Sequence, residues 1–366
     1  TQSPAGTLNV TVQPAGAEKI QLIADYDPAG EQPAPGKMAP SGFEGRTGAP
    51  RSKLAGSPVS YLVQVVDHYW NLSLSSAASV MVSDTDPNNA ACAPVNPVVF
   101  TGSTTVTCTL VSASVDGARK AQVDNYALNE SNPSSVITVT GQPADRLLAL
   151  FPGETRVQGK TAAPAGKTTP AAMDFQAGSI TTVTVVGVDQ YYNTDTSAGL
   201  LVTGNVFSDP NDVTPAALNL VGGTTRFFFV PVTASTHNVI VQSASLPALT
   251  STYVTPNPVT VWWSKPEKLQ VLAAGQKASP GAQPYDQDPT TGGRAADLPS
   301  ALTAGVTTQI TVNLVDRYFN VVKGTTPFLP QSVLPVSSYT AAIEMRFPND
   351  TNIQLRGLAP ALYQKA

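Results

Sequence analysis

The sequence predicts an all-β protein made of three tandem β-sandwich units. Three observations predict it: a composition that favours strands, a short motif that returns three times, and strand patterns at a constant distance from each copy. Of the 366 residues, 13% are charged and 42% are apolar, and Thr, Val, Ser, Ala, Pro and Gly are abundant. Such a composition favours strands joined by turns over helices.

The returning motif has the form Asp-x-Tyr-aromatic-Asn, and we call it the box. Each copy begins eleven residues after the glycine of an Ala-Gly pair. The copies are Asp67, Tyr69, Trp70 and Asn71; Asp189, Tyr191, Tyr192 and Asn193; and Asp316, Tyr318, Phe319 and Asn320. A constant offset in three places is typical of a repeat protein, so we interpret the box as structural.

Short strands open the chain and each unit. Residues 7–12 alternate polar and apolar side chains and predict one strand, with Leu8, Val10 and Val12 on one face. Opening strands are predicted at residues 18–22, 145–150 and 267–272. Their spacing of 127 and then 122 residues (Ile20 to Leu147 to Leu269) is the size of one immunoglobulin-like sandwich with an enlarged loop.

A long segment rich in Gly, Pro and Ala follows each opening strand, at residues 27–54, 152–176 and 273–303. We call these the Gly/Pro segments. They have almost no apolar periodicity and predict extended loops. Loops of this length are uncommon inside compact domains and are usually functional or mobile. Two interpretations stay open: a segment that lies across a neighbouring unit or subunit, and a flexible surface loop.

The strand before each box alternates most clearly. Apolar or small residues fall five, seven and nine positions after the Ala-Gly glycine, as in Tyr61, Val63 and Val65. This period of two predicts one face in a core and one face in water. Within the box, we expect the Asp to accept backbone N–H bonds and the Asn to adopt the left-handed conformation or cap the loop. We expect both aromatic side chains to cover the end of the core.

A valine-rich strand that starts at an Ala-Gly pair and runs into Asp, an aromatic pair and Asn resembles the immunoglobulin-like repeats of invasin- and intimin-type bacterial surface proteins. The resemblance covers all three units through the box. It implies tandem sandwiches in an extracellular or cell-surface protein. The chain departs from the family pattern at Trp70, Tyr192 and Phe319, where the family usually has glycine. The family's repeats are also shorter and lack the Gly/Pro segments.

Less regular strands complete the first two units. Residues 226–232 and 238–241 predict a hairpin around Thr233 to His237, and residues 104–110 are their counterpart in the first unit. Closing strands are predicted at residues 136–140 and 258–262. The resulting division is an N-terminal segment (1–14), unit 1 (15–141), unit 2 (142–264) and unit 3 (265–366).

The two ends of this division do not match. The strand at residues 7–12 aligns with the closing strand of a unit, although no unit precedes it, and the closing strand of unit 3 would fall beyond Ala366. An unpaired sheet edge beside an open core invites another strand. We therefore expect the N-terminal strand of one copy to complete unit 3 of another, giving a head-to-tail filament by donor-strand complementation. The alternative is that these residues are a window of a longer tandem array.

Two cysteines, Cys92 and Cys108, both fall in unit 1. We predict a disulfide between them, which closes a loop of about 15 residues and contributes roughly 3 kcal/mol in the chain-entropy model. Two buried thiols are the alternative. Short acidic clusters give weak calcium candidates, which ordinary turn chemistry explains equally well. The residues of these clusters are Asp84, Asp86, Asn88, Asp209, Asn211 and Asp212.

Function is bounded mainly by what the chain lacks. Its histidines, His68 and His237, have no nucleophile or second ligand nearby in sequence, so we expect no enzyme and no cofactor. A net charge of −4 gives no basic face for nucleic acid, and the apolar runs are too short to span a bilayer. The expected partners are other copies of the chain, and a glycan or host-surface ligand is left open. Two alternatives remain, the stalk of an adhesin and carbohydrate-binding modules of a secreted enzyme.

Overall fold

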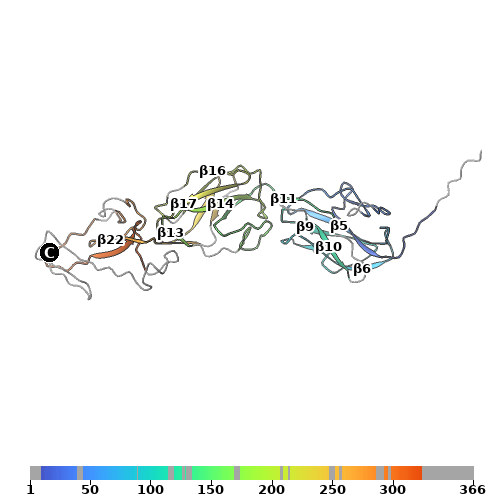
Figure 1. Cartoon of the computed structure of the whole chain (residues 1–366), viewed down its shortest axis with the longest axis horizontal. Helices are drawn as coiled ribbons and strands as arrows, with labels where there is room; N and C mark the ends of the chain where they lie inside the picture. The colour runs from blue at the N-terminus through green and yellow to red at the C-terminus, as the bar shows by residue number, and fades with distance from the viewer. Residues whose placement is uncertain are drawn as a thin grey trace, which may run out of the picture.

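The computed structural model is all-β throughout the residues it describes, which are 10–38, 44–88, 90–113, 119–125, 128, 134–168, 174–206, 209–212, 215–246, 252–254, 258–285, 292–295 and 298–323. The strands of units 1, 2 and 3 follow one another along the long axis of the molecule (Figure 1). No helix long and apolar enough to cross a membrane occurs in the described ranges.

Unit 1 is an immunoglobulin-like sandwich of two antiparallel sheets. The first sheet has the order β1-β5-β9-β7 (Lys19–Ile23, Pro58–Val66, Ser103–Thr109 and Ala90–Ala93), and the second has the order β10-β6-β8 (Ala121–Asn125, Ala77–Asp84 and Val98–Thr101). Apolar side chains of both sheets, among them Tyr61, Val80 and Val106, meet in one core. A disulfide joins Cys92 on β7 to Cys108 on β9, inside this core.

Unit 2 repeats this architecture with its own core. Its sheets have the orders β12-β14-β17 (Arg146–Leu150, Thr181–Val188 and Thr224–Phe229) and β16-β15-β19-β20 (Leu218–Asn219, Leu201–Val206, Val239–Gln242 and Thr252–Val254). The predicted hairpin of residues 226–241 is wrong. Strand β17 pairs with β14 and β19 pairs with β15, so the connection around Thr233 crosses from one sheet to the other.

The closing strands pair with the ends of the Gly/Pro segments. Strand β11 (Val139–Thr140) runs parallel to β4 (Lys53–Leu54), and β21 (Val259–Trp262) runs parallel to β13 (Asp174–Gln176). Strand β18 (Thr236–His237) pairs with β21 on its other side. Strand β11 is shorter than predicted, but Ile137, which precedes it, is still in the unit 1 core.

Unit 3 is described only in its first half. Strands β22 (Pro266–Leu272) and β23 (Thr311–Asp316) pair antiparallel, as their counterparts do in units 1 and 2. The predicted absence of a closing strand concerns residues 324–366, which lie outside the described residues, as does Leu8 of the predicted donor strand. Val10 and Val12 are described, belong to no strand of this chain and are exposed.

The central strand β5 differs from its predicted alternation, because it is buried on both faces. Gln64, on the face expected to meet water, is buried beside Gln21 of β1. The Gly/Pro segment covers this face: Gln21 Nε2 donates to the Gly45 carbonyl at 2.8 Å. Two short strands of the same segment, β2 (Gln32–Pro33) and β3 (Arg46–Thr47), pair with each other. The segment therefore folds back over its own unit as a cover.

Candidate functional site: the box and the joints between units

The box is a tight turn built around its aspartate. In unit 1, Asp67 Oδ1 accepts the backbone N–H groups of Tyr69 (2.8 Å) and Asn71 (2.9 Å). Asp67 Oδ2 accepts Asn71 Nδ2 and the backbone N–H of Ala15, both at 2.9 Å. The expected backbone bonds are thus present. The last of these bonds is informative, since Ala15 directly follows the N-terminal segment.

The same bond ties each box to the chain that enters its unit. In unit 2, Asp189 Oδ2 accepts the backbone N–H of Gln142 at 2.9 Å. In unit 3, Asp316 Oδ2 accepts the backbone N–H of Ser264 at 2.8 Å. Gln142 and Ser264 come two residues after the closing strands β11 and β21. The box therefore fixes where the closing strand of one unit leaves for the next.

The left-handed residue of the box is the second aromatic. Of the two expectations for the Asn, the left-handed conformation is therefore wrong, and its side chain instead bonds to the box Asp. Trp70, Tyr192 and Phe319 have φ angles of 67°, 63° and 62°. A side chain in this region costs roughly 1–2 kcal/mol because its Cβ approaches the following carbonyl. This is also the position at which the invasin- and intimin-type repeats usually have glycine. The chain must gain more from the ring than it loses from the backbone.

The first of two contacts that favour the ring of the second aromatic in every unit is with a basic side chain. A basic side chain from the opening strand lies over it: the Lys19 Nζ atom is 4.5 Å from the Trp70 ring centroid, and the Lys268 Nζ atom is 4.2 Å from that of Phe319. Arg146 takes the same position over Tyr192. Cation–π contacts of this kind contribute about 0.5–2 kcal/mol each.

A glycine of the Gly/Pro segment packs against the same ring. A Cβ atom on this glycine would overlap the ring in each unit, so no other residue fits. The pairs are Gly45 with Trp70, Gly166 with Tyr192, and Gly293 with Phe319. The second aromatic thus packs within its own unit, between the opening strand and the Gly/Pro segment.

The first aromatic of units 2 and 3 reaches into the preceding unit, so the prediction that both rings cover their own core is wrong for Tyr191 and Tyr318. Tyr191 of unit 2 packs against the core of unit 1. Its ring occupies the place where a Cβ of Gly56, from the Ala-Gly pair of unit 1, would stand. Tyr318 of unit 3 lies in the same way on Gly178 of unit 2. Gly56 and Gly178 therefore leave room for the tyrosine ring of the next unit, and we call such a glycine a socket.

The box asparagine completes the joint with two hydrogen bonds to the preceding unit. Asn193 accepts the N–H of Ala113 through Oδ1 at 2.7 Å and donates to the Val111 carbonyl through Nδ2 at 2.8 Å. Asn320 makes the same pair of bonds to Ala234 N–H (2.7 Å) and the Val232 carbonyl (2.8 Å). Both asparagines are buried, so these polar groups are matched inside the interface.

Two of the calcium candidates, Asp86 and Asp209, hold the backbone to which the box asparagine of the next unit bonds. Asp86 Oδ2 accepts the N–H groups of Val111 (2.6 Å) and Ser112 (2.8 Å). Asp209 Oδ2 does the same with Val232 (3.2 Å) and Thr233 (3.1 Å). These bonds hold the backbone that faces the next unit. Asp86 and Asp209 thus have a structural role, through bonds to backbone that is distant in sequence.

Each of these aspartates is followed, two residues later, by an asparagine that crosses the joint. Asn88 Nδ2 donates to the Gln158 carbonyl of unit 2 at 2.9 Å, and Asn211 Nδ2 donates to the Pro280 carbonyl of unit 3 at 3.1 Å. Gln158 and Pro280 belong to the Gly/Pro segments. The segments of units 2 and 3 thus contact the preceding unit, as the first of the two interpretations expects.

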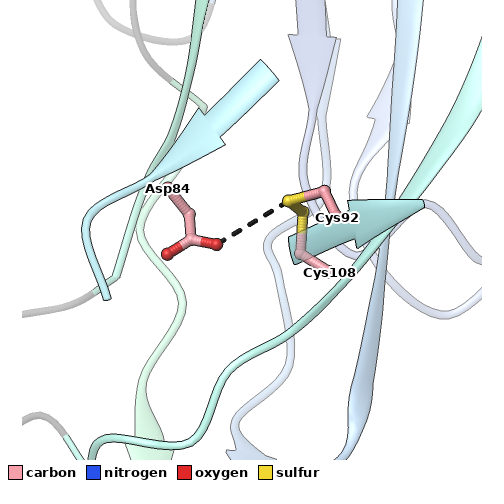
Figure 2. Close-up of side chains that lie close together, drawn as sticks. All are labelled: Asp84, Cys92 and Cys108. Atoms are coloured by element: carbon pink, nitrogen blue, oxygen red, sulfur yellow. Dashed lines mark hydrogen bonds between the residues drawn. A yellow bond between two sulfur atoms is a disulfide. The ribbon is translucent and has the colours of Figure 1, made fainter. Parts of the chain in front are cut away.

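Asp84, the remaining candidate of unit 1, lies beside the disulfide. Its Oδ2 atom is 3.8 Å from Cys92 Sγ, as Figure 2 shows. Asp84, Cys92 and Cys108 form the one group of three potential metal ligands in the described residues. The two sulfur atoms are bonded to each other, which removes the thiolates that a metal would need. The fourth candidate, Asp212, donates its backbone N–H to the Asp209 carbonyl at 3.2 Å.

Solved structures of low similarity match the chain. FdeC, an adhesin of Escherichia coli, is 13% identical, with 85% of this chain and 77% of that chain covered and a TM-score of 0.31. The D00-D0 domain of intimin is 14% identical (58% and 94% covered, TM-score 0.26). A beta-glycosidase from Bacteroides vulgatus is 9% identical (68% and 25% covered, TM-score 0.25). At these TM-scores, the matches carry no argument about what this chain does.

No family model matches the chain, and no curated protein matches it. What the chain does must therefore be inferred from its joints. The residues of the joint that sequence reasoning missed are the Ala-Gly glycines as sockets and Asp86, Asn88, Asp209 and Asn211 as joint residues. Their signal was available, since Asp-x-Asn returns at almost the repeat distance.

The joint between units 2 and 3 should loosen in acid. Burial by itself raises the pKa of Asp209, but the Thr233 hydroxyl and three backbone N–H groups outweigh it and hold that pKa below its ordinary value. Because the folded pKa is lowered, the stabilisation is complete above the unfolded pKa of about 4 and is lost as the pH falls through the folded pKa. We expect the apparent stability of units 2 and 3 to fall below about pH 4 and to change little from pH 5 to 8.

Thermal unfolding followed against pH checks this expectation. The matched variant is Asp209→Asn, which should be less stable at pH 7 and should lose less stability between pH 5 and 3. Subtracting its profile isolates Asp209 from other acids that titrate in the same range, such as Asp67 and Asp195, whose pKa values are also lowered by hydrogen bonds that outweigh burial. Parallel profiles for the two proteins would contradict the assignment.

Proposed function

We propose that this chain is a structural protein of the cell surface or extracellular space, a stiff rod of sandwich units that extends head to tail by strand donation. One observation carries the proposal: both internal joints are made from the same contacts at the same repeat positions. A tyrosine occupies a glycine socket, the box asparagine bonds to the preceding backbone, and a second asparagine bonds to the following Gly/Pro segment.

Directional contacts support stiffness. Interfaces between domains of one chain are usually mobile unless the contact is large or specific. Here four asparagine amides bond across the two joints, and Asn193 and Asn320 are buried there. A bend at either joint would strip these groups of partners at about 1–3 kcal/mol for each buried group. Successive units should therefore keep a fixed angle.

The N-terminal segment supports strand donation. Ala15 is held by Asp67 just as Gln142 is held by Asp189. Residues 10 and 12 thus correspond to Ile137 and Val139, which are buried in the unit 1 core. Val10 is 73% exposed and Val12 is 82% exposed. Residues 7–12 have the sequence pattern of a closing strand, and residues 10–12 belong to no strand of the described chain.

The described residues of unit 3 offer a place for such a strand. In units 1 and 2, the closing strand runs parallel to the residues that precede the Ala-Gly pair. The corresponding residues of unit 3 form no strand, and Leu302 among them is 67% exposed. Val306, just after the Ala-Gly pair, is exposed as well. A donated strand would pair with this edge and cover these side chains.

Charging the donor strand should abolish assembly. The variant is the double substitution Val10→Asp with Val12→Asp, which places two carboxylates on the face that enters the recipient core, where an unpaired charge is strongly disfavoured. The matched control is Thr11→Asp, between them on the opposite face. Electron microscopy and sedimentation of the native protein should show long fibres for the wild type and the control, and single copies for the double variant. Fibres of the double variant would rule out strand donation.

A second candidate is the stalk of a longer adhesin. Both described joints connect consecutive units of one chain. Residues 7–12 could therefore complete a preceding unit of the same, longer chain as well as unit 3 of another copy. The intact mass of the native protein and its appearance in micrographs separate the two: isolated rods of greater mass indicate a stalk. Carbohydrate binding by the box rings has less support, because Trp70 and Phe319 are buried and Tyr191 packs on the preceding unit.

A further inference from the structure

The joint face of units 2 and 3 has a counterpart on unit 1. Its tyrosine, Tyr69, is 54% exposed, whereas Tyr191 and Tyr318 are half-buried in joints. Asn71, half-buried, bonds within the described residues only to Asp67. These side chains make a complete joint face that no described residue covers.

A glycine beside this face shows the same difference. In units 2 and 3, the corresponding glycines, Gly159 and Gly281, are packed so closely against Ser112 and Thr233 of the preceding unit that a Cβ would overlap them. At Gly36, no described residue lies within 4 Å of where a Cβ would stand. The backbone of unit 1 is thus shaped for a neighbour at this point.

One part of the matching half of the joint, the glycine of the Ala-Gly pair, is described on unit 3. Gly305 belongs to the third Ala-Gly pair and has a φ of 80°, close to the 82° of Gly56 and of Gly178. Those two glycines are filled sockets, covered by Tyr191 and Tyr318. At Gly305, no described residue lies within 4 Å of where a Cβ would stand. Within the described residues, unit 1 thus has a tyrosine without a socket, and unit 3 has an Ala-Gly glycine without a tyrosine.

We propose that the end face of unit 1 docks on unit 3 of a second copy of this chain, with the Tyr69 ring in the Gly305 socket. The inference rests on the proposed strand donation and adds a rigid contact to it. At the internal joints, the closing strand of one unit and the tyrosine of the next act on the same preceding unit, because the box aspartate holds the exit of the strand. Asp67 holds Ala15 in the same way. A copy that donates residues 7–12 must bring Tyr69 to the end of the recipient.

The consequence is a filament whose joints between copies are equal to its joints within copies. Every unit would then be related to the next by the same contacts, and stiffness would continue across the boundary between copies. A strand held only by donation would leave a flexible link there. Docking therefore decides whether the assembly is a continuous rod or a chain of hinged rods.

Photo-crosslinking of the full chain tests the contact directly. The photoreactive residue p-benzoylphenylalanine replaces Tyr69, and copies labelled with ¹⁵N are mixed with unlabelled copies before irradiation. We expect a crosslink between position 69 of one copy and the peptide that contains Gly305 of another. The same residue at position 191 is the positive control, and it should react with the peptide that contains Gly56 of its own chain. Crosslinks from position 69 to any other segment, or none while the control reacts, would overturn the docking.

Two single substitutions measure what the contact contributes. Tyr69→Ala should weaken association between copies roughly tenfold or more, as removal of a central tyrosine usually does, and should make fibres more flexible. Gly305→Asn should do the same, because Asn tolerates a positive φ but its Cβ fills the socket. The controls are Tyr26→Ala, an exposed tyrosine outside the face, and Gly153→Asn, at a positive φ in open space.

The outcomes separate this inference from the proposed function. Fibres that form with wild-type affinity and stiffness in both Tyr69→Ala and Gly305→Asn would leave strand donation standing and overturn docking. Fibres that survive the Val10 and Val12 charges would overturn donation itself. A crosslink from position 69 to an upstream unit of the same, longer chain would overturn the second copy as the occupant.

Discussion

Replacing Asp189 with alanine should lower the free energy of unfolding of unit 2 by about 4 kcal/mol, since each hydrogen bond to a charged group contributes about 1.5–3 kcal/mol. Asp189 is fully buried. Its two oxygens accept four N–H groups: the backbone of Tyr191 (2.8 Å), Asn193 (2.9 Å) and Gln142 (2.9 Å), and Asn193 Nδ2 (3.0 Å). Alanine would leave these donors without a partner in a site that excludes water.

The variant Asp189→Asn distinguishes the charge from the shape. Its amide oxygen can still accept the bonds of Tyr191 and Asn193, but its NH₂ group would face the donors of Gln142 and of the Asn193 side chain. We expect a loss of about 2 kcal/mol. Asp124→Ala, at an exposed aspartate on β10, should change stability by less than about 0.5 kcal/mol.

Calorimetry and urea unfolding, with the transition of unit 2 followed separately, measure these losses. The Ala variant should also loosen the joint to unit 1, because Asp189 orients Asn193 for its bonds to Val111 and Ala113. A loss below about 1 kcal/mol in the Ala variant would show that the box is not held together by its aspartate, since that is the scale of one neutral hydrogen bond.

The sequence predicts those elements of the fold that depend on short, local residue patterns. Opening strands, central strands and the box turn each fall within about ten residues, and the structure has all of them. The hairpin at residues 226–241 was wrong because two alternating strands joined by a short connection look the same whether they pair or change sheets. Only the pairing of β17 with β14 and of β19 with β15 distinguishes the two.

The burial of β5 on both faces could not be predicted because it depends on a distant segment. Gln21 and Gln64 are polar and alternate with apolar residues, which favours a wet face. They are instead satisfied by each other and by the Gly45 carbonyl, which the Gly/Pro segment brings from outside the strand pattern. A segment without periodicity of its own gives no sign of the surface that it will cover.

The joints were missed for a related reason. Asp86, Asn88, Asp209 and Asn211 were assigned to calcium or to turns, since their spacing suits both. Their role in the joint appears only when the carbonyls of Gln158 and Pro280 arrive from the next unit. Comparing the copies at the repeat distance would have shown that the same acids and amides stand at the same end of each unit.

Trp70→Ala should destabilise unit 1 by about 4 kcal/mol, in the range of a buried Trp truncated to Ala. Trp70 is buried, lies under Lys19 and fills the space beside Gly45. Its φ of 67° is unfavourable for any residue with a Cβ, alanine included. The expected loss is therefore that of the ring alone, with the backbone cost unchanged.

Trp70→Gly removes the same ring and also relieves the backbone. We expect it to be more stable than Trp70→Ala by about 1 kcal/mol, the lower end of the left-handed cost. Urea unfolding of both variants beside the wild type gives the two numbers. The Gly variant should still be less stable than the wild type, because the packing of the ring and its contact with Lys19 outweigh the strain.

A Gly variant as stable as the wild type would contradict this ordering. It would mean that the ring gives nothing beyond what glycine gives in the repeats that this chain resembles. If the ordering holds, contacts of the ring offset its backbone cost, and one of them is with the Gly/Pro segment, since Gly45 comes from that segment and a Cβ there would overlap the ring. The Gly/Pro segment and the second aromatic of the box would then depend on each other. A unit with one and without the other would be less stable.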